Sequence, residues 1–157
     1  MALTIFLDTS VLLAGLIDFG PQSAPAQSLL HAVTEGRVRA AATAWHCCLE
    51  FFSVATRLPP EFRLMPGDAV TLLEQEVFAR IAIHDLPAAD RVAMLRAAAH
   101  DAIAGGRVYD AHIAEVARAV RASVIVTDNR RHFLSALRYD VRVETPAEFL
   151  ASIKDRK

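Results

Sequence analysis

The chain has few cysteines, no long apolar run and no large excess of charge of one sign, and each absence excludes a class of protein. Its two cysteines, Cys47 and Cys48, are adjacent, which is poor geometry for a disulfide between them, so reduced and packed thiols are expected. No apolar stretch approaches the roughly 20 residues that span a bilayer, and no basic segment of the signal-peptide type opens the chain. We therefore expect a cytoplasmic protein without a membrane segment.

The charge is nearly balanced, with 17 Lys and Arg against 18 Asp and Glu. This balance excludes the strongly basic footprint of a nucleic-acid coat protein, although basic side chains outnumber acidic ones in the last third of the chain. The sequence contains no Gly-rich phosphate loop. What is present is 54% hydrophobic residues in 157, enough for one well-buried core, so residues 1–157 are expected to form a single domain.

Strand-like and helix-like segments alternate along the chain. The predicted strands are 3–7, 38–42, 80–84, 123–127 and 141–143. The helical patterns between and after them include 44–58, 68–79, 88–104 and 108–121. Thr43 is expected to cap the first of these helices, and Gly105 and Gly106 to end the third. The alternation predicts an α/β fold, a parallel sheet with helices on both faces.

Two aspartates follow predicted strands directly. Asp8 comes after the first strand and Asp128 after the fourth, and the carboxyl ends of parallel strands are where open α/β sheets bind ligands. Each residue could instead cap the helix that follows it, which is a common use of Asp. Their position makes both candidates for a site, and the capping alternative stays open for each.

Two further acids lie within helical patterns. Glu50 stands in a segment in which nearly every neighbour is apolar, and glutamate is seldom buried without a partner. It could also lie at a helix edge that reaches solvent. Asp110 falls in the first turn of its helix, where the helix dipole alone is enough to explain a negative charge.

Taken together, these acids and their neighbours resemble a known family. The motifs are Leu7-Asp8-Thr9-Ser10-Val11-Leu12-Leu13, Glu50, Tyr109-Asp110-Ala111-His112-Ile113-Ala114 and Thr127-Asp128-Asn129. In order, spacing and structural context they resemble the PIN-domain ribonucleases, especially the toxins of VapBC-type toxin–antitoxin pairs. Each motif is short, but the resemblance spans nearly the whole chain.

The resemblance implies a PIN-like three-layer α/β/α sandwich with a parallel five-stranded sheet in the order 3-2-1-4-5. Asp8, Glu50, Asp110 and Asp128 would then surround a pocket above the strand ends. Four carboxylates in one pocket repel one another unless a cation neutralises them, and hard oxygen ligands suit Mg²⁺ or Mn²⁺. The implied activity is endonucleolytic hydrolysis of RNA by a metal-activated water, which leaves 5′-phosphate and 3′-hydroxyl ends.

Residues beside the acids have implied roles of their own. Ser10 and Thr127 resemble hydroxyls that hold the acids in position, although helix capping is an equally good explanation for both. Arg130 and Arg131 would stand at the rim of the pocket and could contact RNA phosphates, or else solvent or a partner's acidic groups. None of the six histidines is assigned a catalytic role; surface or packed positions are expected for all of them.

The implied partners are an RNA substrate, a VapB-like protein antitoxin and a second copy of the chain. The apolar segment 51–77 resembles the helical hairpin that such toxins present to antitoxins, although most of it could be core. Two alternatives remain. One is a catalytically silent PIN-like interaction module. The other is a receiver-like switch phosphorylated on Asp8, against which Ser10 stands where a paired acid would be needed.

Overall fold

The centre of the protein is a five-stranded parallel sheet, seen in a computed structural model that describes residues 3–155. Its strands are β1 (Thr4–Leu7), β2 (Ala40–Ala44), β3 (Ala82–His84), β4 (Val124–Val126) and β5 (Arg142–Glu144). They lie in the order β3-β2-β1-β4-β5, which confirms the predicted order. Leu7, the last residue of β1, is paired with Thr43 on one side and Val126 on the other. The residues that follow β1 and β4 are therefore neighbours.

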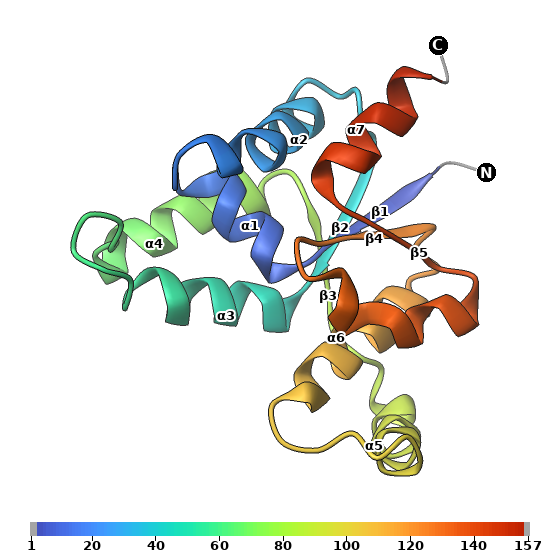
Figure 1. Ribbon diagram of the computed structural model, residues 1–157. Coiled ribbons are helices and arrows are strands. Elements are labelled where there is room, and N and C mark those ends of the chain that lie inside the picture. The colour runs from blue at the N-terminus through green and yellow to red at the C-terminus, as the bar shows by residue number, and fades with distance from the viewer. Residues whose placement is uncertain (1–2, 156–157) are drawn as a thin grey trace.

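Helices cover both faces of this sheet (Figure 1). The α-helices are α1 (Thr9–Leu16), α2 (Ala24–Thr34), α3 (Trp45–Ala55), α4 (Pro66–Leu72), α5 (Arg91–His100), α6 (Arg107–Ala119) and α7 (Pro146–Lys154). Shorter helical segments are η1 (Pro21–Ser23), η2 (Leu73–Phe78), η3 (Ala88–Asp90) and η4 (Arg130–Tyr139). Figure 1 shows α1, α2 and α7 on one side of the sheet and α5 and α6 on the other, so the three-layer α/β/α arrangement is confirmed.

The core is built around the central strands. Phe6 and Leu7 of β1 and Ile125 of β4 are fully buried, as expected for strands covered on both faces. Both cysteines are buried free thiols, as predicted, and burial raises the pKa of Cys47 to about 12 and that of Cys48 to about 11. Within residues 3–155, no helix combines the length and apolar character needed to cross a bilayer.

The expected capping role of Thr43 is wrong. Thr43 lies inside β2, fully buried, and Ala44 is the residue that precedes α3. Its hydroxyl donates a hydrogen bond of 2.7 Å to the carbonyl oxygen of Leu7 in the neighbouring strand. A buried hydroxyl needs a hydrogen-bond partner, and Thr43 has one in the main chain of the neighbouring strand rather than at the start of α3.

The ends of two predicted helices also differ from expectation. The helix predicted over 68–79 begins at Pro66 and changes after Leu72 into the π-helical turn η2. The helix predicted to end at Gly105 and Gly106 ends at His100, because Ala102 takes the left-handed conformation (φ 56°). The amides of Ala102 and Ile103 then bond back to the carbonyls of Ala99 and Ala98, a Schellman ending formed without glycine.

Candidate active site

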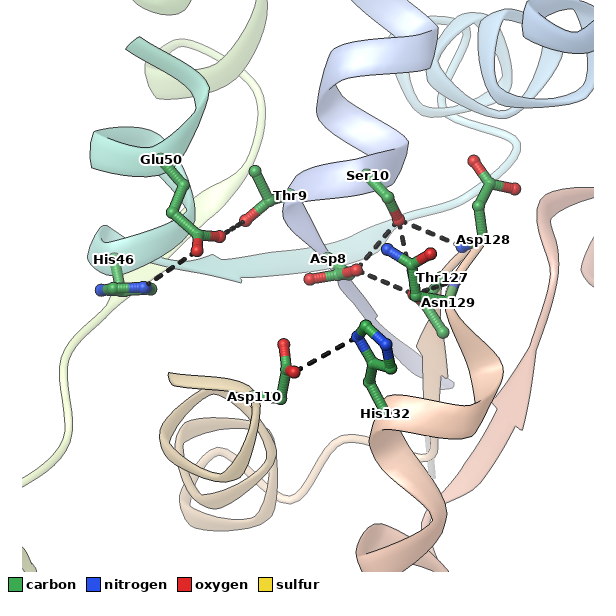
Figure 2. Close-up of polar contacts among 10 residues, drawn as sticks. All are labelled: Asp8, Thr9, Ser10, His46, Glu50, Asp110, Thr127, Asp128, Asn129 and His132. Carbon is green, nitrogen blue, oxygen red and sulfur yellow. Dashed lines mark hydrogen bonds and ion pairs between the residues drawn. The ribbon is translucent and has the colours of Figure 1, made fainter. Parts of the chain in front are cut away.

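Three carboxylates from three separate elements line one pocket of about 330 Å³ at the carboxyl end of β1 (Figure 2). Asp8 directly follows β1, Glu50 lies in α3, and Asp110 lies in the first turn of α6. The other lining residues are Thr9, Ser10, Leu13, Val54, Gly106, Tyr109, Asn129 and His132. This is the point at which the strand order reverses between β1 and β4, where α/β sheets place ligands. The fold therefore brings together three acids that lie 42 and 60 positions apart in the chain.

Asp8 is the most buried of the three, with 4% of its surface exposed. One of its oxygens, Oδ2, accepts hydrogen bonds from the Ser10 hydroxyl (2.9 Å) and the Thr127 hydroxyl (2.8 Å). Its other oxygen points toward the space between Glu50 and Asp110 (Figure 2). Burial raises the pKa of Asp8 despite these hydrogen bonds, because the cost of removing the charge from water outweighs them. The side chain does not cap α1, so the capping alternative is wrong for Asp8.

Ser10 and Thr127 each connect Asp8 to the loop after β4. While their hydroxyls donate to Asp8, the Ser10 oxygen accepts the amide N–H of Asp128 (3.1 Å) and the Thr127 oxygen accepts that of Asn129 (2.9 Å). Each hydroxyl therefore donates to the Asp8 carboxylate and accepts a main-chain N–H of the loop after β4. Because these amides lie outside any helix, helix capping is not the contact that either residue makes. The pairing of β1 with β4 makes these contacts possible.

Glu50 approaches the pocket from α3. Its side chain is 37% exposed, its Oε2 accepts a hydrogen bond from the Thr9 hydroxyl, and its Oε1 lies 3.4 Å from Nε2 of His46 one helical turn earlier. That nitrogen is buried without a hydrogen-bond partner in the described part of the chain. The helix edge therefore reaches the pocket, and Glu50 is held by a neighbouring hydroxyl rather than by the core.

Asp110 is held by a histidine from the opposite wall. Its Oδ2 lies 3.2 Å from Nδ1 of His132, in η4, and its side chain is 29% exposed. Burial raises the pKa of Asp110; the charge of Glu50 adds to that rise, and His132 opposes it. The helix dipole alone is therefore an incomplete account of this residue.

Asp128 is placed differently from the other three acids. It is exposed, it does not line the pocket, and Figure 2 shows its carboxylate turned away from Asp8. The next residue, Asn129, lines the pocket instead. The cause is the turn after β4, in which the hydroxyls of Ser10 and Thr127 hold the amides of Asp128 and Asn129.

A profile of the PIN domain family matches residues 4–131, a range that contains all four acids. The chain belongs to the PIN domain family. It is 38% identical over 92 residues to "Ribonuclease VapC27" from Mycobacterium tuberculosis, a match that covers 59% of this chain and 65% of that relative, so it spans somewhat less than two thirds of the relative's length. The similarity to VapC-type PIN domains expected from the motifs is thus found independently.

Solved structures share this PIN domain fold. FitAcB from Neisseria gonorrhoeae superposes with a TM-score of 0.60 at 20% identity, covering 92% of this chain and 99% of that one. VapC20 of Mycobacterium tuberculosis, described as a Sarcin-Ricin loop cleaving toxin, has a TM-score of 0.60 at 16% identity and covers 78% of this chain and 87% of that one. These likenesses establish the architecture.

Two histidines of this PIN domain, for which the sequence predicted no catalytic role, contact acids of the pocket. His46 and His132 do lie at the surface or against neighbours, as expected for all histidines, but each is also paired with a pocket acid. The i,i+4 spacing of His46 and Glu50 on one helix is a signal that could have found the first pair. His132 and Asp110 meet only through the packing of η4 on α6, which no local pattern reveals.

The pocket of the PIN domain fits a hard divalent cation by its donor set. Asp8, Glu50 and Asp110 offer carboxylate oxygens, the ligands that Mg²⁺ and Mn²⁺ prefer, and a cation would offset the unfavourable charge of buried Asp8. As placed, no three Asp, Glu, His or Cys side chains in residues 3–155 stand close enough together to hold an ion. Glu50 contacts Thr9 and Asp110 contacts His132, so these two half-buried side chains would have to turn to complete a set of ligands around an ion.

Proposed function

We propose that this PIN domain, acting as one domain over residues 1–157, is a metal-dependent endoribonuclease that hydrolyses RNA phosphodiester bonds. The observation that carries the proposal is the meeting of Asp8, Glu50 and Asp110 in one pocket at the switch point of the sheet. The 38%-identical relative is named a ribonuclease, and the similar structure of VapC20 is described as that of a Sarcin-Ricin loop cleaving toxin, which supports the same chemistry here.

In this proposal Asp8, Glu50 and Asp110 hold Mg²⁺ or Mn²⁺. When bound, such an ion lowers the pKa of a coordinated water and neutralises charge on the leaving oxygen of a phosphodiester. Asp128 would join the ligands only after turning its side chain from its present position.

The surrounding residues orient these acids. Ser10 and Thr127 both donate to the same oxygen of Asp8, which fixes its other oxygen toward the pocket. Thr9 orients Glu50 through a hydrogen bond to Oε2. Such neighbours of a metal ligand typically change metal affinity or activity by 10–100-fold when they are removed, on the order seen in other metal sites.

The receiver-like alternative is disfavoured by topology. Receiver-type doubly wound sheets run 2-1-3-4-5, whereas this sheet runs 3-2-1-4-5. Asp8 also has hydroxyl donors, Ser10 and Thr127, where a receiver would need a second acid. The silent interaction module is the remaining alternative, and the cleavage experiment below separates it from a nuclease.

We further propose that the chain is the toxin of a VapBC-like pair, acts in the cytoplasm and forms a homodimer. An apolar groove of about 200 Å³ between α3, α4 and η2 is suited to an amphipathic segment of a protein antitoxin. Its lining is Trp45, Cys48, Leu49, Phe52, Val70, Leu73 and Phe78. Trp45, Leu49, Val70 and Phe78 are between 41% and 50% exposed, which is unusual for such large apolar side chains on one surface.

Part of the segment first considered for this role belongs to the core. Phe62 packs on Phe19 with ring centroids 5.1 Å apart, and Leu64 and Leu72 pack against the buried cluster. Phe52 and Leu73 do line the groove. Co-expression with the product of an adjacent gene tests the pairing: a stable complex that Leu49→Asp weakens supports it, and a chain that stays unbound contradicts it.

Cleavage of RNA by the purified chain, free of any antitoxin, tests the nuclease proposal. We expect cleavage with Mg²⁺ or Mn²⁺, none with EDTA, and none by Asp8→Asn. An Asp8→Asn preparation that cuts as fast as the wild type would show that the activity comes from a contaminant or from another site. A folded wild-type chain that cuts no RNA with either metal would favour the silent module.

A further inference from the structure

A second pocket, of about 250 Å³, adjoins the acid pocket and has the opposite charge. Two arginines line it: Arg107, the first residue of α6, and Arg131, in η4. Ile103 and Leu134 form an apolar part of the wall of this pocket. Arg131 was predicted to stand at the rim of the acid pocket, where it could contact RNA phosphates, whereas no role was predicted for Arg107.

The two pockets share a wall. This wall is formed by Asp110 and His132, which line both pockets and face each other in Figure 2. The two pockets also adjoin at the start of α6, because Gly106 lines the acid pocket and the next residue, Arg107, lines the second one. A ligand that spans the shared wall would therefore meet the carboxylates on one side and the arginines on the other.

The charge of Arg107 opposes the rise in the pKa of Asp110, which lines the same pocket. Within residues 3–155, neither Arg107 nor Arg131 forms an ion pair with a carboxylate, whereas Arg130 binds Glu148 and Arg118 binds Glu115. The one acid of the second pocket, Asp110, is paired with His132 at the shared wall. The described lining of this pocket thus presents two guanidinium groups that form no ion pair.

We propose that Arg107 and Arg131 form a phosphate subsite that binds an RNA phosphate next to the one held over the acid pocket. A guanidinium group matches phosphate geometry and can bind it through two parallel N–H···O bonds. The subsite rests on the proposed ribonuclease function, since it supplies the contact that holds the strand across the shared wall. Arg130, bound to Glu148, takes no part in it.

RNA binding tests the subsite directly. Affinity is measured with fluorescein-labelled single-stranded RNA of mixed sequence, in the Asp8→Asn background with Mg²⁺ so that the RNA stays intact, over a range of salt concentrations. Arg107→Gln and Arg131→Gln are each expected to weaken binding about tenfold, as for a lost charge-assisted hydrogen bond. Each should also reduce the salt dependence by about 0.7 in the slope of log K against log salt, the share of one phosphate of a single strand.

Arg96→Gln is the matched control, because Arg96 is an exposed α5 residue outside both pockets and its replacement changes the net charge equally. It should bind as tightly as the parent. In the chain with Asp8 intact, the two subsite variants should raise KM for RNA and leave kcat unchanged, since a contact equal in ground and transition states affects binding alone. Arg131→Lys should recover part of the lost affinity.

The outcomes separate the subsite from the function it rests on. If the Asp8→Asn parent binds RNA and the wild-type chain cleaves it, but Arg107→Gln and Arg131→Gln behave like Arg96→Gln, the subsite is wrong and the ribonuclease proposal stands. If the Asp8→Asn parent does not bind RNA and the wild-type chain does not cleave it, the ribonuclease proposal fails and the subsite fails with it. Weaker binding with an unchanged salt slope would also overturn the subsite, because it indicates a general structural effect.

Discussion

The two sides of the acid pocket are built differently. On the sheet side, Asp8 is buried and its carboxylate is fixed by Ser10 and Thr127 at the junction of β1 and β4. On the helix side, the side chains of Glu50 and Asp110 are about one third exposed. Glu50 contacts the Thr9 hydroxyl and His46, and Asp110 contacts His132. In the proposed metal site, Asp8 would therefore be a preorganised ligand, whereas Glu50 and Asp110 would have to turn toward the ion.

The largest expected effect separates Asp8 from Asp128. Asp8→Asn should lower kcat for RNA cleavage by at least about 10²-fold, the scale of a single strong electrostatic group in an active site. Asp128→Asn should cost much less, because its carboxylate lies outside the pocket. Cleavage assays on both variants decide this, and equal losses would mean that Asp128 turns into the site during the reaction.

The next effect tests the rigidity of the sheet side. Thr127→Val keeps the side-chain shape but removes a hydrogen bond to Asp8, so the midpoint of Mn²⁺ activation should rise about 10–100-fold. Ser152→Ala in α7, whose hydroxyl donates to the carbonyl oxygen of Phe149 outside the acid pocket, is the control and should leave the midpoint unchanged. An unchanged midpoint in Thr127→Val would mean that Asp8 needs no such support.

A stability measurement without metal checks the burial of Asp8. Its pKa is raised in the folded chain, so the ionised form destabilises the fold: stability is lost as pH rises from the unfolded-state pKa through the folded one. Metal-free Asp8→Asn should therefore melt above the wild type at pH 7, by about 2–4 °C for each kcal/mol recovered. The difference should shrink as pH falls toward the unfolded-state pKa. A lower Tm for Asp8→Asn at pH 7 contradicts this account.

The smallest effect is expected on the helix side. His132→Gln removes the contact between His132 and Asp110. Side-chain pairs that are this exposed contribute about 0–1 kcal/mol, so cleavage should change by no more than about fivefold. His31→Gln, which breaks the exposed pair with Glu35 far from the pocket, is a control for the loss of a surface histidine pair. A loss of 10²-fold in His132→Gln would mean that this wall is as rigid as the other.

Local sequence patterns determined much of this protein. Apolar runs followed by Asp located β1 and β4, and the alternation of strands with helices predicted a parallel sheet covered on both faces. The sheet order came from the family resemblance, which the fold confirms. These features follow from side-chain periodicity and from the identity of the residue after a strand, both of which are local properties.

Only the tertiary structure decided which polar groups meet. Thr43 bonds across the sheet instead of capping a helix, and Asn129 rather than Asp128 faces the pocket because the hydroxyls of Ser10 and Thr127 shape the turn after β4. His132 reaches Asp110 from an element 22 positions later in the chain. Each outcome depends on hydrogen bonds between segments far apart in the chain, and no pattern within one segment encodes which distant donor will be nearest.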